Sequence, residues 1–424
     1  MYRRQIASAL ALLVSCFLFG QPAGTYSENT RSDSISRIGF SAYFNPGKII
    51  ALDRHVENLV SDNKTYGVGI EMSYQTMPKD SCGYASDFRY PSFNFGIRYT
   101  FNNDVRMHRG ENMGMEDWQI ADYGSRLGNS ISAYFHFCRP FVRARHWEVD
   151  YTIGVGLAYS DLAYEKSNNV DNELIGSHMS VYFNFGVHTT WHIVPQWGIR
   201  AGVDFVHHSN GALDRPNKGS NALGPMIGLT YTPYYEELVN SYFRYDPPFK
   251  HYWYMNVSVG VGAMTASQDW NITQYDVDVS DPDYRTEEFK LYATYSAQVD
   301  VMYRYQRRWA SGIGVDLFYG TYYKHQETID ENGGYSYSHS PWSLGIAGKH
   351  EIFYRNWSVP MEFGFYVYRQ MGRYARKTET PYYERIGVRY NMPKADNLYI
   401  GISLQAHAAK ANFTEINVGV PFRF

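Results

Sequence analysis

The last residues of the chain alternate strictly between apolar and more polar side chains. The apolar positions are Ile416, Val418, Val420, Phe422 and Phe424, and the residues between them are Asn417, Gly419, Pro421 and Arg423. A period of two places successive side chains on opposite faces of a β-strand. An apolar outer face, a more polar inner face and a terminal aromatic residue are typical of the last strand of a bacterial outer-membrane β-barrel. The sequence therefore predicts that lipid surrounds this chain.

The composition favours a barrel over a bundle of membrane helices. The 424 residues include 40 Tyr and 9 Trp, and the mean hydropathy of −0.44 is too polar for a helical membrane protein. Alternating strands and aromatic girdles at both rims give a barrel this composition. The net charge of −3 gives no reason to expect nucleic acid as a partner.

The N-terminus has the pattern of a cleaved secretory signal. Two arginines precede a mostly apolar run from Ile6 to Phe19, and a small, polar stretch follows as far as Ser27. We therefore expect residues 1–27 to be a signal peptide and residues 28–424 to form an integral barrel of the bacterial outer membrane.

About 16 later segments have the pattern of strands. Their connections mostly alternate between short and long, as periplasmic turns and external loops do. Two connections, Thr76–Tyr90 and Pro233–Tyr252, are long for periplasmic turns, and the second would suit a linker between two smaller barrels. Cys82 and Cys138 both fall on the periplasmic side, where either a disulfide or two free thiols can exist.

A weak internal repeat bears on the number of barrels. The segment at Gly186-Val187-His188 aligns with Gly348-Lys349-His350, which joins the sixth candidate strand to the twelfth. Two tandem barrels of eight strands would join the sixth to the fourteenth. We therefore expect an all-β protein with one transmembrane antiparallel β-barrel of about 14–16 strands, and two tandem eight-stranded barrels are the alternative.

The residues that carry chemistry lie at the outer end of the seventh candidate strand. His207 and Ser209 are two residues apart, so both side chains lie on one face of the strand, within hydrogen-bond reach. A His that acts as a base toward a Ser hydroxyl is the core of serine esterase chemistry. The tripeptide alone is not specific, because His178-Met179-Ser180 is a second copy.

The two copies differ in the face on which they lie. His207 and Ser209 continue the apolar, lipid-facing side of their strand, whereas His178 and Ser180 point into the lumen. A polar pair on the lipid side is costly unless it has a function, and lipid of the outer leaflet lies beside it. The structural alternative is two interfacial polar residues at a strand end, where the cost is small.

The pattern His207-x-Ser209-Asn210, followed by Pro216-Asn217-x-Gly219, resembles the outer-membrane lipid A 3-O-deacylases (PagL-like acyloxyacyl hydrolases). The resemblance covers roughly residues 37–232 and leaves residues 252–424 as additional strands. It implies that Ser209 is the nucleophile and His207 the general base. It also implies that Asn210, Gly211 and nearby backbone N–H groups stabilise the oxyanion.

The third catalytic position departs from this family. A Glu is expected twelve residues after the Ser, and Asn221 stands there. An Asn can orient a His but does not stabilise an imidazolium by charge, and Asp214 is a second candidate for that role. Arg215 and Lys218 lie in the same loop, and each either binds a phosphate of lipid A or is an ordinary solvated charge.

The sequence thus predicts a serine esterase that removes an ester-linked acyl chain from lipid A of lipopolysaccharide, without a cofactor. No His/Cys spacing indicates zinc, and the aspartates between Asp276 and Asp283 suit an ordinary acidic loop better than a calcium site. The alternative is a non-enzymatic barrel, porin-like or structural, with a degenerate site. The oligomeric state stays open.

Overall fold

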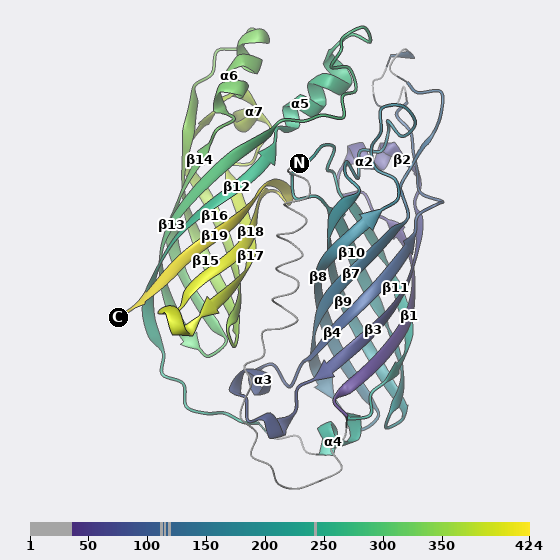
Figure 1. Cartoon of the computed structure of the whole chain (residues 1–424), viewed down its shortest axis with the longest axis vertical. Helices are drawn as coiled ribbons and strands as arrows, with labels where there is room; N and C mark the ends of the chain where they lie inside the picture. The colour runs from purple at the N-terminus through teal and green to yellow at the C-terminus, as the bar shows by residue number, and fades with distance from the viewer. Residues whose placement is uncertain (1–35, 111–112, 114–115, 118–119, 241–243) are drawn as a thin grey trace.

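The strands close into two separate barrels that stand side by side (Figure 1). The computed structural model describes residues 36–424 except 111–112, 114–115, 118–119 and 241–243. The predicted all-β, antiparallel barrel architecture is confirmed, but the preferred single barrel of about 14–16 strands is wrong. The alternative of two tandem eight-stranded barrels is the one observed. The expected signal peptide, residues 1–27, lies outside the described residues.

The first barrel closes because its first strand pairs with its last. Strand β1 is hydrogen-bonded to β11 on one side and to β3 on the other, and all pairs are antiparallel. Its eight strands are β1 (Ile38–Ile49), β3 (Lys64–Gln75), β4 (Ser92–Phe101), β7 (Ser130–Arg143), β8 (Trp147–Ser160), β9 (Met179–Val194), β10 (Trp197–Ser209) and β11 (Ser220–Tyr231).

The second barrel closes in the same way, through the pairing of β12 with β19. The connection Pro233–Tyr252, which contains helix α4 (Tyr235–Asn240), is the linker between the two barrels. The eight strands are β12 (Tyr252–Thr265), β13 (Leu291–Gln306), β14 (Trp309–Gly320), β15 (His339–Tyr354), β16 (Trp357–Met371), β17 (Tyr382–Met392), β18 (Leu398–His407) and β19 (Lys410–Arg423).

The internal repeat gave the wrong number of barrels for a physical reason. It compares the side-chain patterns of strands, and every strand of both barrels has the same period of two. Similar patterns therefore do not decide which strand of one half corresponds to which strand of the other. Closure is decided by backbone hydrogen bonds between strands that are far apart in the sequence, β1 with β11 and β12 with β19.

Side chains cross and fill the lumen of the second barrel. Lys349 Nζ lies 2.6 Å from Asp300 and 2.6 Å from Asp316. Gln298 on β13 donates to Glu362 on β16 at 2.9 Å, so this contact joins strands that are not neighbours. The interior of a small barrel is just wide enough for side chains to fill, and this ionic network argues against the porin-like alternative.

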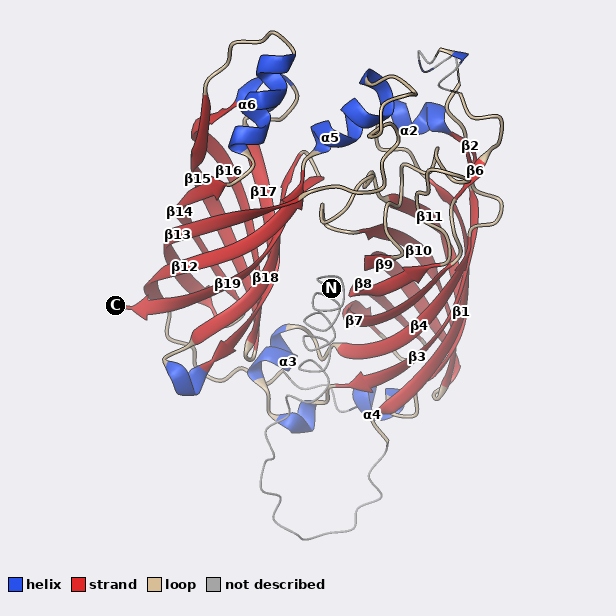
Figure 2. Ribbon diagram, turned by 45° about the horizontal axis from the view of Figure 1, so that its top comes forward, coloured by secondary structure: helices blue, strands red, loops and turns tan. Residues whose placement is uncertain are grey.

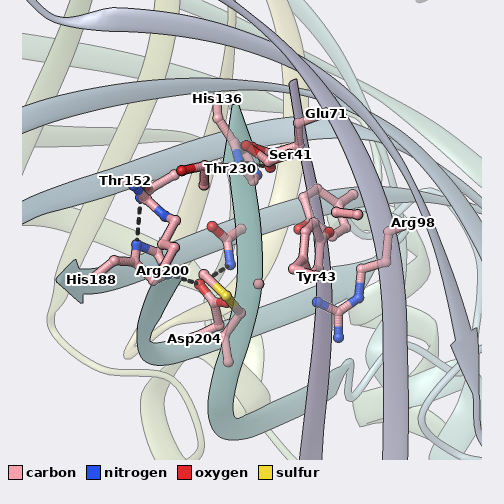
Figure 3. A pocket seen from close by; sticks show the side chains of 15 residues that line it. Ser41, Tyr43, Glu71, Arg98, His136, Thr152, His188, Arg200, Asp204 and Thr230 are labelled. Atoms are coloured by element: carbon pink, nitrogen blue, oxygen red, sulfur yellow. Dashed lines mark hydrogen bonds and ion pairs between the residues drawn. The ribbon is translucent and has the colours of Figure 1, made fainter. Parts of the chain in front are cut away.

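The lumen of the first barrel is also polar, and Figure 3 shows a cavity in it. Arg200 makes two hydrogen bonds to Asp150, at 2.6 and 2.8 Å, and His188 Nε2 lies 3.2 Å from Asp204. Neither His207 nor Ser209 lines this cavity. The cavity is therefore separate from the pair that the sequence singled out.

Short helices and a small sheet cover the two ends of the barrels (Figure 2). No described helix has both the length and the apolar character that crossing a membrane requires. The end with the longer loops carries α2 (Arg54–Leu59), β2 (Val60–Asp62), β5 (Arg106–Met107), β6 (Ser125–Arg126), α5 (Ser267–Asn271), the π-helical η4 (Ile272–Asp276), α6 (Tyr323–Asn332) and α7 (Gly372–Lys377). The opposite end carries η1 (Pro78–Asp80), α3 (Gly83–Asp87), α4 and η5 (Pro393–Ala395).

The long turn Thr76–Tyr90 joins the two barrels at the end with the shorter turns. Asp87 accepts a hydrogen bond from Arg307 at 2.9 Å, and Tyr354 packs its ring 5.8 Å from that of Phe88. This docking explains why the turn is longer than an ordinary periplasmic turn. The two cysteines, Cys82 and Cys138, are both free, so the disulfide alternative is wrong.

Candidate active site

The adjacent strands β10 and β11 bring His207, Ser209 and Asn221 together. The first two residues end β10, and the register of the sheet pairs His207 directly with Asn221 near the start of β11. Side chains alternate along β10, so His207 and Ser209 share a face with the exposed residues Ile199 and Val203. The three polar side chains therefore lie on the outer wall of the first barrel.

The three side chains form one hydrogen-bonded chain. His207 Nε2 lies 2.9 Å from Ser209 Oγ, and His207 Nδ1 lies 2.7 Å from Asn221 Oδ1. Asn221 Nδ2 donates to the Gly219 carbonyl at 3.5 Å, which leaves its Oδ1 as the acceptor. His207 thus carries its proton on Nδ1, and Nε2 accepts a hydrogen bond from the Ser209 hydroxyl. This tautomer suits a base that acts on the Ser hydroxyl.

The polar site is largely buried although it lies on the outer wall. Ser209 is 9 % exposed and Asn221 is 4 % exposed. The Ile50 N–H donates to the Asn221 carbonyl at 2.7 Å and so fixes the backbone of Asn221. Gly219 lies directly against the imidazole, because a Cβ at this position would be 2.6 Å from His207 Cε1. The neighbouring main chain therefore leaves the imidazole little room to turn.

The loop after β10 is organised by Asn210. Its backbone N–H donates to Asn217 Oδ1 at 3.0 Å, and its Nδ2 donates to Ser177 Oγ at 3.3 Å and to the Asp214 carbonyl at 3.2 Å. The next residue, Gly211, has φ +65°, a left-handed conformation that glycine adopts without strain. These bonds give the turn beside Ser209 a defined backbone conformation.

The charged residues of this loop have different surroundings. Arg215 is 9 % exposed, its guanidinium donates to the Thr265 carbonyl of the second barrel at 2.7 Å, and burial lowers its pKa to about 10. Lys218 is exposed, and its Nζ lies 3.8 Å from Glu173. Asp214 accepts the backbone N–H of Arg215 at 3.0 Å. Because Asn221 occupies His207 Nδ1, Asp214 is not the residue that orients the imidazole.

Sequence reasoning missed Glu173, a fully buried carboxylate in the loop between β8 and β9. It accepts hydrogen bonds from Arg109 Nε at 2.9 Å and Tyr275 OH at 2.7 Å, and His55 Nε2 lies 2.8 Å away. Burial alone would raise the pKa of Glu173, but Arg109 and His55 hold this pKa well below its ordinary value. No local pattern links these residues, because they come from four separate loops.

The described residues contain no group of three His, Cys, Asp or Glu side chains arranged to hold a metal ion. The aspartates between Asp276 and Asp283 therefore form no such cluster in the described part of the chain.

Two family models match the chain. That of the lipid A 3-O-deacylase (PagL) matches residues 84–230, and that of the acyloxyacyl hydrolase C-terminal domain matches residues 251–424. The first match lies in the barrel that carries His207 and Ser209, and the second covers the other barrel. No curated protein matches the chain.

Solved structures of outer-membrane barrels show weak similarity. The outer membrane enzyme PagL is 15% identical over 45% of this chain and 97% of its own, with a TM-score of 0.26. CdiB from Acinetobacter baumannii is 9% identical over 92% of this chain and 60% of its own, with a TM-score of 0.17. A mutant of Rh. blastica porin is 8% identical over 91% of this chain and 100% of its own, with a TM-score of 0.16.

Proposed function

Because the chain belongs to the lipid A 3-O-deacylase (PagL) family of outer-membrane enzymes, which hydrolyse an ester bond, we propose that it is a serine hydrolase. Its substrate in this proposal is an ester-linked acyl chain of lipid A in the outer leaflet. The observation that carries the proposal is the hydrogen-bonded chain from Ser209 through His207 to Asn221, on the barrel wall that faces lipid. Such a chain of nucleophile, base and orienting group serves acyl transfer on several unrelated folds.

In the first half of the reaction, Ser209 Oγ attacks the ester carbonyl while His207 Nε2 takes the hydroxyl proton. The carbonyl oxygen becomes an oxyanion, and in this proposal the backbone N–H of Gly211 stabilises it, because the N–H of Asn210 is already bonded to Asn217. The intermediate collapses with cleavage of the ester C–O bond. His207 then gives its proton to the departing sugar oxygen, and the acyl group remains on Ser209.

In the second half, a water molecule attacks the acyl-enzyme and His207 Nε2 takes its proton. A second tetrahedral intermediate collapses, the fatty acid departs, and the proton returns to Ser209 Oγ. Asn221 keeps the imidazole in the required tautomer throughout. Lys218, which is exposed at the rim of the site, would contact a phosphate of lipid A in this proposal, whereas the buried guanidinium of Arg215 is bonded to the Thr265 carbonyl.

The activity itself is tested by mass spectrometry of lipid A from cells with and without the protein. Cells that contain it should show lipid A that has lost one ester-linked acyl chain. An identical acylation pattern in both strains would exclude a deacylase that is active in those cells. Purified protein in planar bilayers should show no steady conductance, because side-chain contacts cross the lumen of both barrels. Gln298 reaches Glu362 in the second barrel, and Tyr43 on β1 reaches Tyr134 on β7 at 2.8 Å in the first.

Replacing Asn221 by Ala should lower kcat by about 10- to 100-fold, because the imidazole loses the group that fixes its tautomer. KM should stay close to that of the wild type. Asn221→Asp retains an acceptor for the Nδ1 proton and should keep most of the activity. Asn391→Ala removes an amide that donates to Asn356 at 3.1 Å, and it serves as the control. A fully active Asn221→Ala variant would show that this amide does not orient the base.

Replacing Gly219 by Ala should lower kcat by about tenfold or more, since a displacement of about 1 Å can cost 10²-fold. The residue has φ +77°, and the added Cβ would press on His207 Cε1 at 2.6 Å. Gly334→Ala is a matched control, because Gly334 has φ +71° but nothing within 4 Å of the added Cβ. The comparison separates backbone strain from displacement of the imidazole. Equal losses in both variants would contradict the proposed contact.

A further inference from the structure

The second barrel holds the loop that follows Ser209. Thr414 Oγ1 on β19 donates to the Gly211 carbonyl at 2.8 Å. Thr265 at the end of β12 donates its N–H and its Oγ1 to the Ala212 carbonyl, at 2.9 and 3.0 Å. Gly211 and Ala212 have φ of +65° and +68°, and an L residue such as Ala adopts this conformation only when its surroundings impose it. Three hydrogen bonds from the other barrel provide that constraint.

A second contact reaches the opposite side of the site. Tyr275, in η4 of the second barrel, donates its hydroxyl hydrogen to the buried carboxylate of Glu173 at 2.7 Å. The backbone carbonyls of Glu173 and Leu174 accept the N–H groups of Lys218 and Gly219, at 3.2 and 3.0 Å. Gly219 in turn lies against the imidazole of His207. The hydroxyl of Tyr275 therefore supports Glu173, and the backbone of Glu173 and Leu174 in turn holds Gly219 against His207.

We propose that the second barrel is part of the catalytic unit and positions the active site of the first. Thr414, Thr265 and Tyr275 are positioning residues, which act through the loop of residues 211–219 and make no contact with the reacting atoms. They hold this loop in the conformation that aligns Ser209 with His207 and keeps the Gly211 turn in place. The inference rests on the proposed function, in which Ser209 is the nucleophile.

The contacts are polar and specific, so they can be removed one at a time without changing the apolar surface. Thr414→Val removes the hydroxyl and keeps the shape of the side chain. Tyr275→Phe removes the hydroxyl that reaches Glu173 and keeps the ring. Thr414→Val takes the side-chain donor from the Gly211 carbonyl, and Tyr275→Phe takes one of several donors from Glu173. Each change should therefore loosen the loop on one side. The double variant removes support from both sides of the site.

The experiment measures deacylation kinetics of the full-length protein, folded in detergent, with purified lipid A as substrate. The double variant of Thr414→Val and Tyr275→Phe should lower kcat by about tenfold, because a loosened loop misaligns the reacting groups. KM should change by less than about twofold, since neither residue touches the substrate. Thr414→Ser retains the hydroxyl and should restore the rate that Thr414→Val loses. The heat-dependent shift in electrophoretic mobility, which reports a folded barrel, should be unchanged.

Two control variants remove the same kinds of hydrogen bond at places away from the proposed active site. Thr321→Val removes a hydroxyl that donates to Ala293 at 2.8 Å within the second barrel. Tyr235→Phe removes a hydroxyl that donates to Ala144 at 2.6 Å, in the α4 segment at the opposite end of the first barrel. Both controls should keep the wild-type kcat. A similar loss of kcat in these controls would overturn the inference.

Failure of the inference and failure of the proposed function are distinguishable. An inactive Ser209→Ala variant, together with wild-type kcat in the double variant, overturns the positioning role and leaves the hydrolase mechanism standing. A fully active Ser209→Ala variant overturns the mechanism itself. If the double variant does not fold, the single variants Thr414→Val and Tyr275→Phe are measured instead. A wild-type kcat in both single variants would overturn the positioning role.

Discussion

Replacing Ser209 by Ala is expected to lower kcat for lipid A deacylation by roughly 10⁴-fold or more, because no other group on the site can form the acyl-enzyme. The barrel should fold normally, since the change removes one oxygen from the end of a strand. The measurement is release of fatty acid from purified lipid A, with mass spectrometry of lipid A from cells that express the variant.

The control for Ser209 is the second copy of the same tripeptide. His178 Nδ1 lies 2.8 Å from the Ser160 carbonyl, and Ser180 is buried on the lumen side of β9. Ser180→Ala should therefore leave deacylation at the wild-type rate. If cells with the Ser209→Ala variant show the same lipid A acylation pattern as cells with the wild type, Ser209 is not the nucleophile and the serine mechanism is wrong.

Replacing His207 by Ala should cost nearly as much as replacing Ser209, because a Ser hydroxyl without its base is a weak nucleophile. The losses should not add. The double variant of Ser209→Ala and His207→Ala should be no slower than the slower single variant, as expected for residues that act as one unit. The measurement is single-turnover release of fatty acid, which isolates the chemical step from product release.

The neighbouring histidine tests the assignment of faces. His208 points into the lumen, where its Nε2 lies 3.3 Å from Ser132 Oγ, and it is 8 % exposed. Folded His208→Ala protein should retain the wild-type kcat. The opposite result, with His208→Ala inactive and His207→Ala active, would place the chemistry inside the barrel and end the proposal of a site that faces lipid.

The sequence predicted much of the site because the necessary pattern is local. A period of two along β10 is enough to place His207 and Ser209 together, on the same face as Ile199 and Val203. The register with β11 then brings in Asn221, twelve residues after Ser209 and across a single loop. The direction of each side chain follows from strand geometry and needs no knowledge of the rest of the fold.

The environment of the loop was not predictable in the same way. Arg215 carries a charge that suits a phosphate, yet its guanidinium donates to a carbonyl of the second barrel. Glu173 and Tyr275 lie about a hundred positions apart in the sequence, and only the docking of the two barrels brings them to 2.7 Å. Contacts of this kind depend on how two separately closed barrels meet, which no local pattern records.

The sequence by itself determined the class of fold, the places of the strands and the face on which each side chain lies, because alternation is a property of every strand on its own. The tertiary structure alone decided that β1 closes on β11 and β12 on β19. It also decided that Thr414, Thr265 and Tyr275 reach the loop beside Ser209. Closure pairs strands that are far apart in the sequence, and docking joins loops that meet only when both barrels have folded, so neither is recorded in the pattern of a single strand.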